Sequence, residues 1–294
     1  MNGEILAFII YFVAIVGVGI YFFFKEKGEA SQSNFFLGGR QMGPWVAAMS
    51  AQASDMSAWL LMGLPGSILA FGFGQMWIGI GLGLGTAANW IFVAKRLRKF
   101  SSAAGDAITV PQYLGNRFMA KSNTLQVICA IIFFVCFTIY VASAYVAGAS
   151  VFTTIFPSLD PQTAILIFAL AMLLITFFGG FKAVCWTDFF QGLLMFATLM
   201  AVPIVIAITK DLDTSALSAI YTYQDAASGQ MVECSFGSGI FDASWQEIIT
   251  GLSWGLGYFG MPHILVRFMS IEKPSMVKKS ATVAIIWVIC ALGC

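Results

Sequence analysis

The stretch MSAQASDMSAW, residues 49–59, places the carboxylate of Asp55 in the middle of a long apolar segment. A charged side chain at the centre of a bilayer costs on the order of 3 kcal/mol even on the lenient insertion scale. Hydroxyl residues surround Asp55, and Gly63, Pro65 and Gly66 follow it, so the stretch is a poor continuous helix. We predict a helix break here, whose freed carbonyls and hydroxyls form an oxygen-rich site for a small cation. The structural alternative is a buried aspartate hydrogen-bonded to a neighbouring helix.

Composition places the whole chain in a membrane. Of the 294 residues, 59% are hydrophobic and only 10% are charged, whereas a soluble domain carries about a quarter charged residues. The formal net charge of +1 gives no reason to expect nucleic acid as a partner. The six cysteines form neither a CxxC pair nor a metal-ligand pattern, and five of them fall in or beside apolar segments. The expected partners are therefore a lipid bilayer and small solutes.

Apolar runs long enough to cross the hydrocarbon core define the expected spans. They lie near residues 5–24, 43–70, 76–94, 124–150, 162–181, 187–209, 246–269 and 280–294. With the N-terminus outside, fourteen of the fifteen basic residues, Arg267 among them, fall at the inner side, and only Lys210 falls outside. This asymmetry follows the positive-inside rule and supports about eight spans. Residues 210–245 are the expected long outer loop.

A second interrupted span lies at residues 251–263, where four glycines and Pro262 fall inside one apolar run. Proline cannot donate to the helix ladder, and each glycine lowers helix propensity by about 1 kcal/mol. Trp254 and Tyr258 are four residues apart, so in a helical stretch they project from one face. We interpret this span as the wall of a cavity, with aromatics that only pack or face lipid as the alternative.

Weaker signals lie elsewhere in the apolar runs. Glycines alternate from Gly79 to Gly85, which favours close contact between two helices over a phosphate-binding loop. Tyr140 inside the fourth span is either a packing residue or a solute contact. His263 has no nucleophile around it, which argues against an enzyme. Asp188 lies where the sixth span leaves the inner loop, so access to water and a role at a helix start are the structural alternative for it.

The motifs of this chain resemble those of the sodium:solute symporter family. The resemblance is carried by FLGGR at 36–40, ASDMS at 53–57 with WLLMGLPG at 59–66, GGF at 179–181, WTD at 186–188, GLGYFG at 255–260 and PHIL at 262–265. It implies an all-α integral membrane protein with a LeuT-like core of two inverted five-helix repeats and one extra N-terminal helix. The chain would be one transmembrane domain, 1–294, with the first repeat at about 43–209 and the start of the second at about 246–294.

The resemblance also implies a site and an activity. It implies a plasma-membrane symporter, not an enzyme, that couples sodium entry to uptake of a small neutral solute such as L-proline by alternating access. The implied sodium positions are the backbone oxygens of Ala53 and Met56, supported by Asp55. The implied solute positions are Ser57, Tyr140, Trp254, Tyr258 and Pro262. Arg40 and Asp188 match positions of gating or coupling.

Two departures from the family pattern leave the identity of the solute open. Ala58 stands where proline-transporting members of the family have glycine, and Met261 stands in place of a glutamine. We expect no Lys or Arg within the spans that could hold an acidic solute. The chain ends inside its eighth span, so we expect a fragment that lacks the remaining sodium ligands of a later helix. Another small-solute symporter, or a channel or sensor on the same fold, is the alternative function.

Overall fold

The computed structural model describes residues 3–25, 31–209, 220–224, 230–235 and 240–293. Its α-helices are α1 (Gly3–Lys25), α2 (Gln32–Leu37), α3 (Pro44–Ala58), α4 (Leu64–Phe71), α5 (Met76–Ala88), α6 (Lys95–Ala103), α7 (Val110–Arg117), α8 (Thr124–Ile155), α9 (Pro161–Thr209), α10 (Trp245–Ser253), α11 (Pro262–Ser270) and α12 (Val277–Gly293). The 3-10 helices are η1 (Gly38–Arg40), η3 (Phe73–Gln75), η6 (Ile240–Asp242), η7 (Trp254–Gly260) and η8 (Pro274–Met276). The π-helical segments are η2 (Trp59–Gly63) and η4 (Asn89–Ala94), and the strands are β1 (Ile220–Gln224) and β2 (Met231–Ser235).

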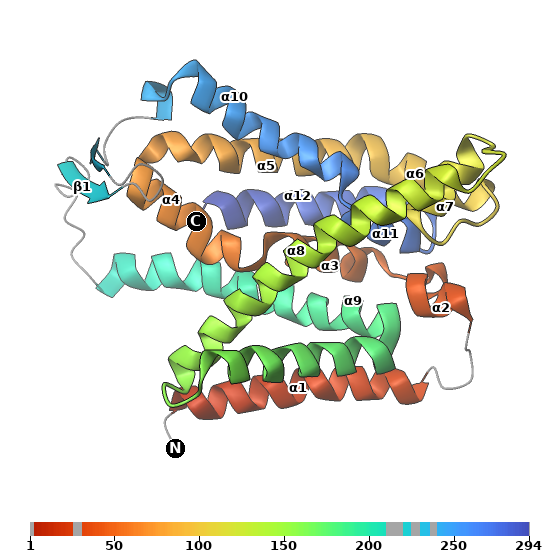
Figure 1. Ribbon diagram of the computed structural model, residues 1–294, viewed down its shortest axis with the longest axis horizontal. Helices are drawn as coiled ribbons and strands as arrows, with labels where there is room; N and C mark the ends of the chain where they lie inside the picture. The colour runs from red at the N-terminus through yellow and green to blue at the C-terminus, as the bar shows by residue number, and fades with distance from the viewer. Residues whose placement is uncertain (1–2, 26–30, 210–219, 225–229, 236–239, 294) are drawn as a thin grey trace.

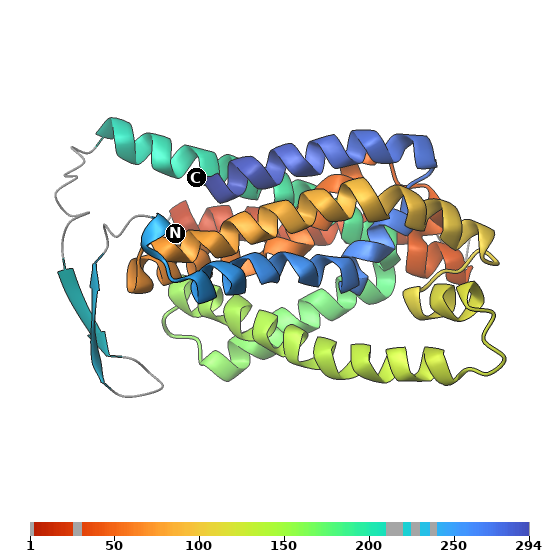
Figure 2. The ribbon, with the colours of Figure 1, turned by 90° about the horizontal axis from the view of Figure 1, so that it is seen from above.

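The long helices run roughly parallel or antiparallel to one another, as a membrane bundle requires (Figures 1 and 2). Five helical stretches of the described residues are long and apolar enough to cross a membrane. One of them, α9, would be about 74 Å long if it were straight, but Gly180 has a φ of 59° and the chain reverses there. It therefore forms two antiparallel spans. The interrupted segments α3–η2–α4 and α10–η7–α11 complete the predicted set of eight.

The centre of the bundle is α3, which packs between α9, α11 and α12. Small side chains allow this close packing, because Ala47, Ala48 and Ala51 are fully buried. Larger residues fill the space beside them, and the rings of Trp90 and Phe268 lie 4.4 Å apart at their centroids. Most of the surface of α8 is exposed, which is typical of a helix in contact with lipid.

A glycine seam, formed by Gly81, Gly85, Gly251 and Gly255, joins α5 to the interrupted span α10–η7. A methyl group added at Gly81 would overlap the carbonyl oxygen of Gly251, and one added at Gly85 would overlap the backbone of Gly255. The two backbones thus approach more closely than any side chain permits. This confirms the close helix contact predicted from the alternating glycines.

The two ends of the bundle differ in charge. Lys25, Lys99, Arg117 and Lys278 lie on the ends of α1, α6, α7 and α12 that gather at one end of the molecule (Figure 1). The hairpin of β1 and β2 lies at the opposite end, within the long loop between α9 and α10. The sequence did not predict these strands. The clustering of basic residues at one end agrees with the predicted split.

We predict that Gly85→Ala destabilises the protein by about 1–3 kcal/mol, because the new methyl group must displace the backbone of Gly255. The matched control on the same helix is Gly83→Ala, whose new methyl group would meet only Leu292 at an ordinary 3.7 Å. The measurement is the fraction of monodisperse protein that survives heating in detergent. Equal stability of the two variants would contradict the packing of the seam.

Candidate functional site

The helix around Asp55 is intact, which corrects the predicted break. The helix α3 continues from Pro44 through Ala58, and the π-helical segment η2 begins only at Trp59. The buried alanines of α3 keep the backbone in regular α-helical hydrogen bonding. The interruption falls downstream, shortly before Pro65, which has no N–H to donate. Single π-helical turns of this kind are frequent at functional sites.

Asp55 is joined to the second interrupted span by a short hydrogen bond. The hydroxyl of Tyr258 donates to Oδ2 of Asp55 at 2.5 Å, and Tyr258 is only 2% exposed. This contact links α3 with η7 across 203 residues of sequence. It is the bond that the structural alternative requires, and it also brings together the two spans that the sequence singled out. The described residues show no ion pair to Asp55.

Trp254 and Tyr258 do not share one face, contrary to the prediction. Residues 254–260 form a 3-10 helix with about three residues per turn, so positions four apart are rotated away from each other. Tyr258 is buried against α3, whereas Trp254 is half exposed. The ring of Trp254 instead stacks on Trp59, with centroids 5.9 Å apart and an interplanar angle of 21°.

Tyr140 contacts α3 beside Asp55 and stacks against the start of α11. The hydroxyl of Tyr140 donates to the carbonyl of Ser54 at 3.1 Å, next to Asp55. The ring of Tyr140 stacks on His263, with centroids 5.7 Å apart, and Pro262 is the first residue of α11. Neither ring nitrogen of His263 has a hydrogen-bond partner among the described residues. The histidine therefore has no relay that would support catalysis.

A buried ion pair connects three helices beneath Asp55. Nη2 of Arg267 lies 2.8 Å from Oδ2 of Asp188, and both residues are at most 9% exposed. The guanidinium also donates to the hydroxyls of Ser50 at 2.6 Å and Ser54 at 2.5 Å. Both hydroxyls in turn donate to Asp188. The pair thereby ties α3, α9 and α11 together.

This ion pair corrects three expectations. Arg267 is an arginine inside a span, not a residue of an inner loop. Asp188 does not reach water, because it is buried in its ion pair. The hydroxyls of Ser50 and Ser54 serve this pair and are not part of an open oxygen nest beside Asp55.

Arg40 connects the end of α11 to the loop between α6 and α7 at the basic end of the bundle. It forms an ion pair with Asp106 at 2.8 Å and donates to the carbonyls of Met269 and Ala107, each at 2.8 Å. Burial lowers the pKa of the Arg40 guanidinium from its ordinary value, and the Asp106 carboxylate acts in the opposite direction.

Arg98 adds a second clamp, which the sequence analysis did not single out. Its guanidinium donates to the carbonyl of Ile271 and, at 2.9 Å, to that of Glu272. The backbone of Met42 pairs with the same segment, because its N–H donates to Ser270 and its carbonyl accepts from Glu272, both at 3.1 Å. Such cationic donors satisfy the free carbonyls that follow a helix.

The expected sodium positions line one stretch of α3. Ala53 faces α9, where a methyl group added at Gly192 would lie 3.3 Å from its Cβ. The carbonyl of Met56 accepts the N–H of Trp59, the first residue of η2. The side chain of Ser57 lies outside the described part of the structure. The described residues hold no group of three or more His, Cys, Asp or Glu side chains that could bind a metal ion.

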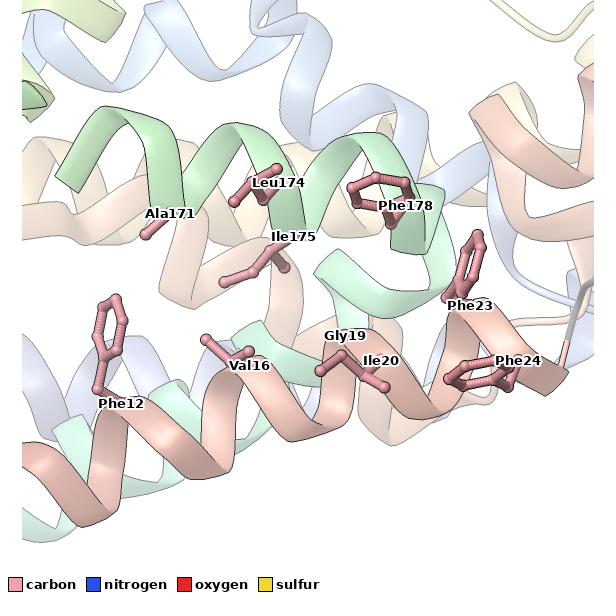
Figure 3. Close-up of a pocket in the computed structure, with 10 residues that line it drawn as sticks. All are labelled: Phe12, Val16, Gly19, Ile20, Phe23, Phe24, Ala171, Leu174, Ile175 and Phe178. Carbon is pink, nitrogen blue, oxygen red and sulfur yellow. The ribbon is translucent and has the colours of Figure 1, made fainter. Parts of the chain in front are cut away.

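The apolar groove between α1 and the first half of α9 is a separate feature (Figure 3). It has a volume of about 530 Å³, and its ten lining residues, Phe12 and Phe178 among them, carry no polar side chain. An apolar lining suits hydrocarbon and offers nothing to a cation or a zwitterion. The groove is therefore not part of the candidate site.

The fold and the site together define a class of protein. Two interrupted helices meet at a partly buried carboxylate inside a bundle of membrane spans, which is the architecture of secondary transporters. The chain belongs to the sodium:solute symporter family, whose family model matches residues 35–293. This assignment places it among membrane transporters and not among enzymes.

Comparison with individual proteins supports the assignment. The chain is 41% identical over 278 residues to the sodium/proline symporters of Staphylococcus aureus strains JH9 and COL, which covers 95% of this chain and 52% of each relative. It thus spans about half the length of these relatives. Its fold matches a solved sodium-coupled sialic acid symporter in a substrate-bound, outward-open state, with a TM-score of 0.72 and 21% identity. That match covers 96% of this chain and 57% of the other. The predicted LeuT-like fold class is confirmed.

We predict that Arg267→Gln destabilises the protein by about 3–5 kcal/mol, because it leaves Asp188 buried without its counter-ion. The double variant Arg267→Gln with Asp188→Asn should recover most of this loss. The control is Lys273→Gln, which breaks an exposed pair with Glu272 and should change stability by about 1 kcal/mol or less. Thermal stability in detergent is the measurement. If the double variant were no more stable than Arg267→Gln, the ion-pair argument would be wrong.

Proposed function

We propose that the protein is a sodium-coupled symporter of the plasma membrane that takes up a small neutral solute, L-proline in particular, by alternating access. The observation that carries the proposal is the contact between Asp55 and Tyr258, which joins the two interrupted spans inside the bundle. The Staphylococcus aureus relatives are sodium/proline symporters, which supports proline as the solute. In this proposal residues 43–209 form the first repeat, and residues 246–294 begin the second.

The charge balance around α3 supports a cation beside Asp55. Asp188 is neutralised by Arg267 at 2.8 Å, whereas Asp55 has no direct ion pair among the described residues and accepts a hydrogen bond from the neutral hydroxyl of Tyr258. A partly buried carboxylate without a direct ion pair favours a positive ion nearby. The carbonyls of Ala53 and Met56 lie on the same turns of α3, and we assign them to sodium as the first half of its coordination shell.

The solute would lie between η7 and the aromatic residues around it. We assign its binding to Ser57, Tyr140, Trp254, Tyr258 and Pro262. Half-exposed Trp254 offers an apolar surface for a small ring. Arg267 is already paired with Asp188, so no free guanidinium is left there for an acidic solute.

Arg40 and Asp188 are assigned to gating and coupling. Both belong to contacts that fasten α11 to the rest of the bundle, and opening of the basic end would have to break them. One sodium ion that crosses a potential of 100 mV releases about 2.3 kcal/mol, which is enough for about fifty-fold accumulation of a neutral solute. A single ion is therefore sufficient to drive uptake.

We predict that Asp55→Asn in the full-length transporter abolishes most sodium-driven uptake of labelled proline while the protein still folds. The amide keeps the shape of the side chain but removes the charge that favours the cation. Uptake should be measured in proteoliposomes with and without an inward sodium gradient, with other small neutral solutes as competitors. Normal uptake with an unchanged sodium dependence would leave Asp55 a structural residue. Wild-type protein without any gradient-driven uptake would point to a sensor or a channel.

We further propose that the N-terminus and the β1–β2 hairpin face the outside, because the basic residues gather at the opposite end. Met119 and Phe241 are 85% and 84% exposed and lie at opposite ends, so they form a matched pair for labelling. In intact cells, an impermeant thiol reagent should label Phe241→Cys and spare Met119→Cys, with the unsubstituted protein as background. The reverse pattern would invert the topology.

A further inference from the structure

Asn89 makes a buried contact with the backbone of η7, next to the proposed site. It is the first residue of the π-helical segment η4, is 1% exposed, and donates from Nδ2 to the carbonyl of Tyr258 at 2.8 Å. Its target is therefore the backbone of the residue whose hydroxyl binds Asp55.

The carbonyl of Tyr258 needs a donor for a reason that is visible in the sequence. Tyr258 lies in the 3-10 helix η7, whose regular donor to its carbonyl would be Met261, the residue that ends the helix; the α-helical donor would be residue 262, which is proline and has no N–H. Met261 has an extended backbone and separates η7 from α11. A buried carbonyl without a donor costs about 1–3 kcal/mol, and nearly all such groups are paired in native proteins. The Asn89 amide supplies a donor where an α-helix would have used the N–H of residue 262.

We propose that Asn89 is a positioning residue of the sodium and solute site. It fixes the 3-10 turn of η7 at the height where Tyr258 reaches Asp55. This inference rests on the proposed symport activity only for its effect on transport. The glycine seam holds the same turn through Gly255, so Asn89 adds a directional bond to a packed contact. The chain Asn89–Tyr258–Asp55 thereby connects η4, η7 and α3.

The first experiment is a double-mutant cycle in the full-length transporter. Asn89→Leu keeps the approximate volume of the side chain and removes its donor. We expect it to raise the sodium concentration for half-maximal proline uptake by up to about tenfold, the loss of one buried hydrogen bond. In a Tyr258→Phe background the same substitution should add little, because Asn89 acts through the Tyr258–Asp55 bond. Fully additive effects would overturn the proposal.

A matched control tests whether the loss of any hydrogen bond from an asparagine side chain to the backbone has the same effect. Asn116 also donates from Nδ2 to a backbone carbonyl, that of Ala104 at 2.7 Å, but it lies on α7, away from η7. Asn116→Leu should leave the half-maximal sodium concentration within about twofold of wild type. A shift equal to that of Asn89→Leu would contradict a specific role for Asn89.

The second experiment does not depend on transport. In a cysteine-free background, the reporter Met261→Cys lies at the junction of η7 and α11. Asn89→Leu should increase its rate of alkylation by N-ethylmaleimide in detergent several-fold, whereas Asn116→Leu should not. An unchanged rate would overturn the positioning role. If the wild-type protein shows no sodium-driven uptake, the proposed function fails, and the alkylation rates still decide the role of Asn89.

Discussion

Non-helical backbone at membrane depth is stable only where protein covers it and satisfies its hydrogen bonds. In this chain the constraint falls on η7, and α5 meets it with two devices. Gly81 and Gly85 let the backbones approach within reach of each other, and Asn89 at the end of α5 donates to the carbonyl of Tyr258. Because η7 is held in this way, Tyr258 can bind Asp55 from a 3-10 turn.

Sequence reasoning predicted the features that depend on composition and on backbone chemistry. Long apolar runs predicted the spans, alternating glycines predicted a close helix contact without naming its partner, and Pro262 predicted the interruption before α11. Each of these follows from a property of a residue that tertiary structure cannot change: apolarity, the absence of a side chain, or the absence of an N–H.

The remaining features depend on partners that lie far away in the sequence. The helix stays intact at Asp55 because the alanines of α3 are enclosed by other helices, and local propensity could not reveal that. Trp254 and Tyr258 diverge because the turn between them is a 3-10 helix. Arg267 pairs with Asp188, which is 79 residues away. The signal for Arg267 was nevertheless present, because a guanidinium inside an apolar run must find a buried partner.

The two carboxylates inside the bundle therefore differ in their contacts. Asp188 has a fixed cation and two serine hydroxyls, which together join α3, α9 and α11. Asp55 is partly buried and accepts a hydrogen bond from one neutral phenol, and the described residues show no direct ion pair to it. In the proposed function, a mobile ion that enters beside Asp55 gains an attraction that the paired Asp188 no longer offers. The arrangement thus separates a permanent ion pair, which holds the helices, from the carboxylate to which we assign the transported ion.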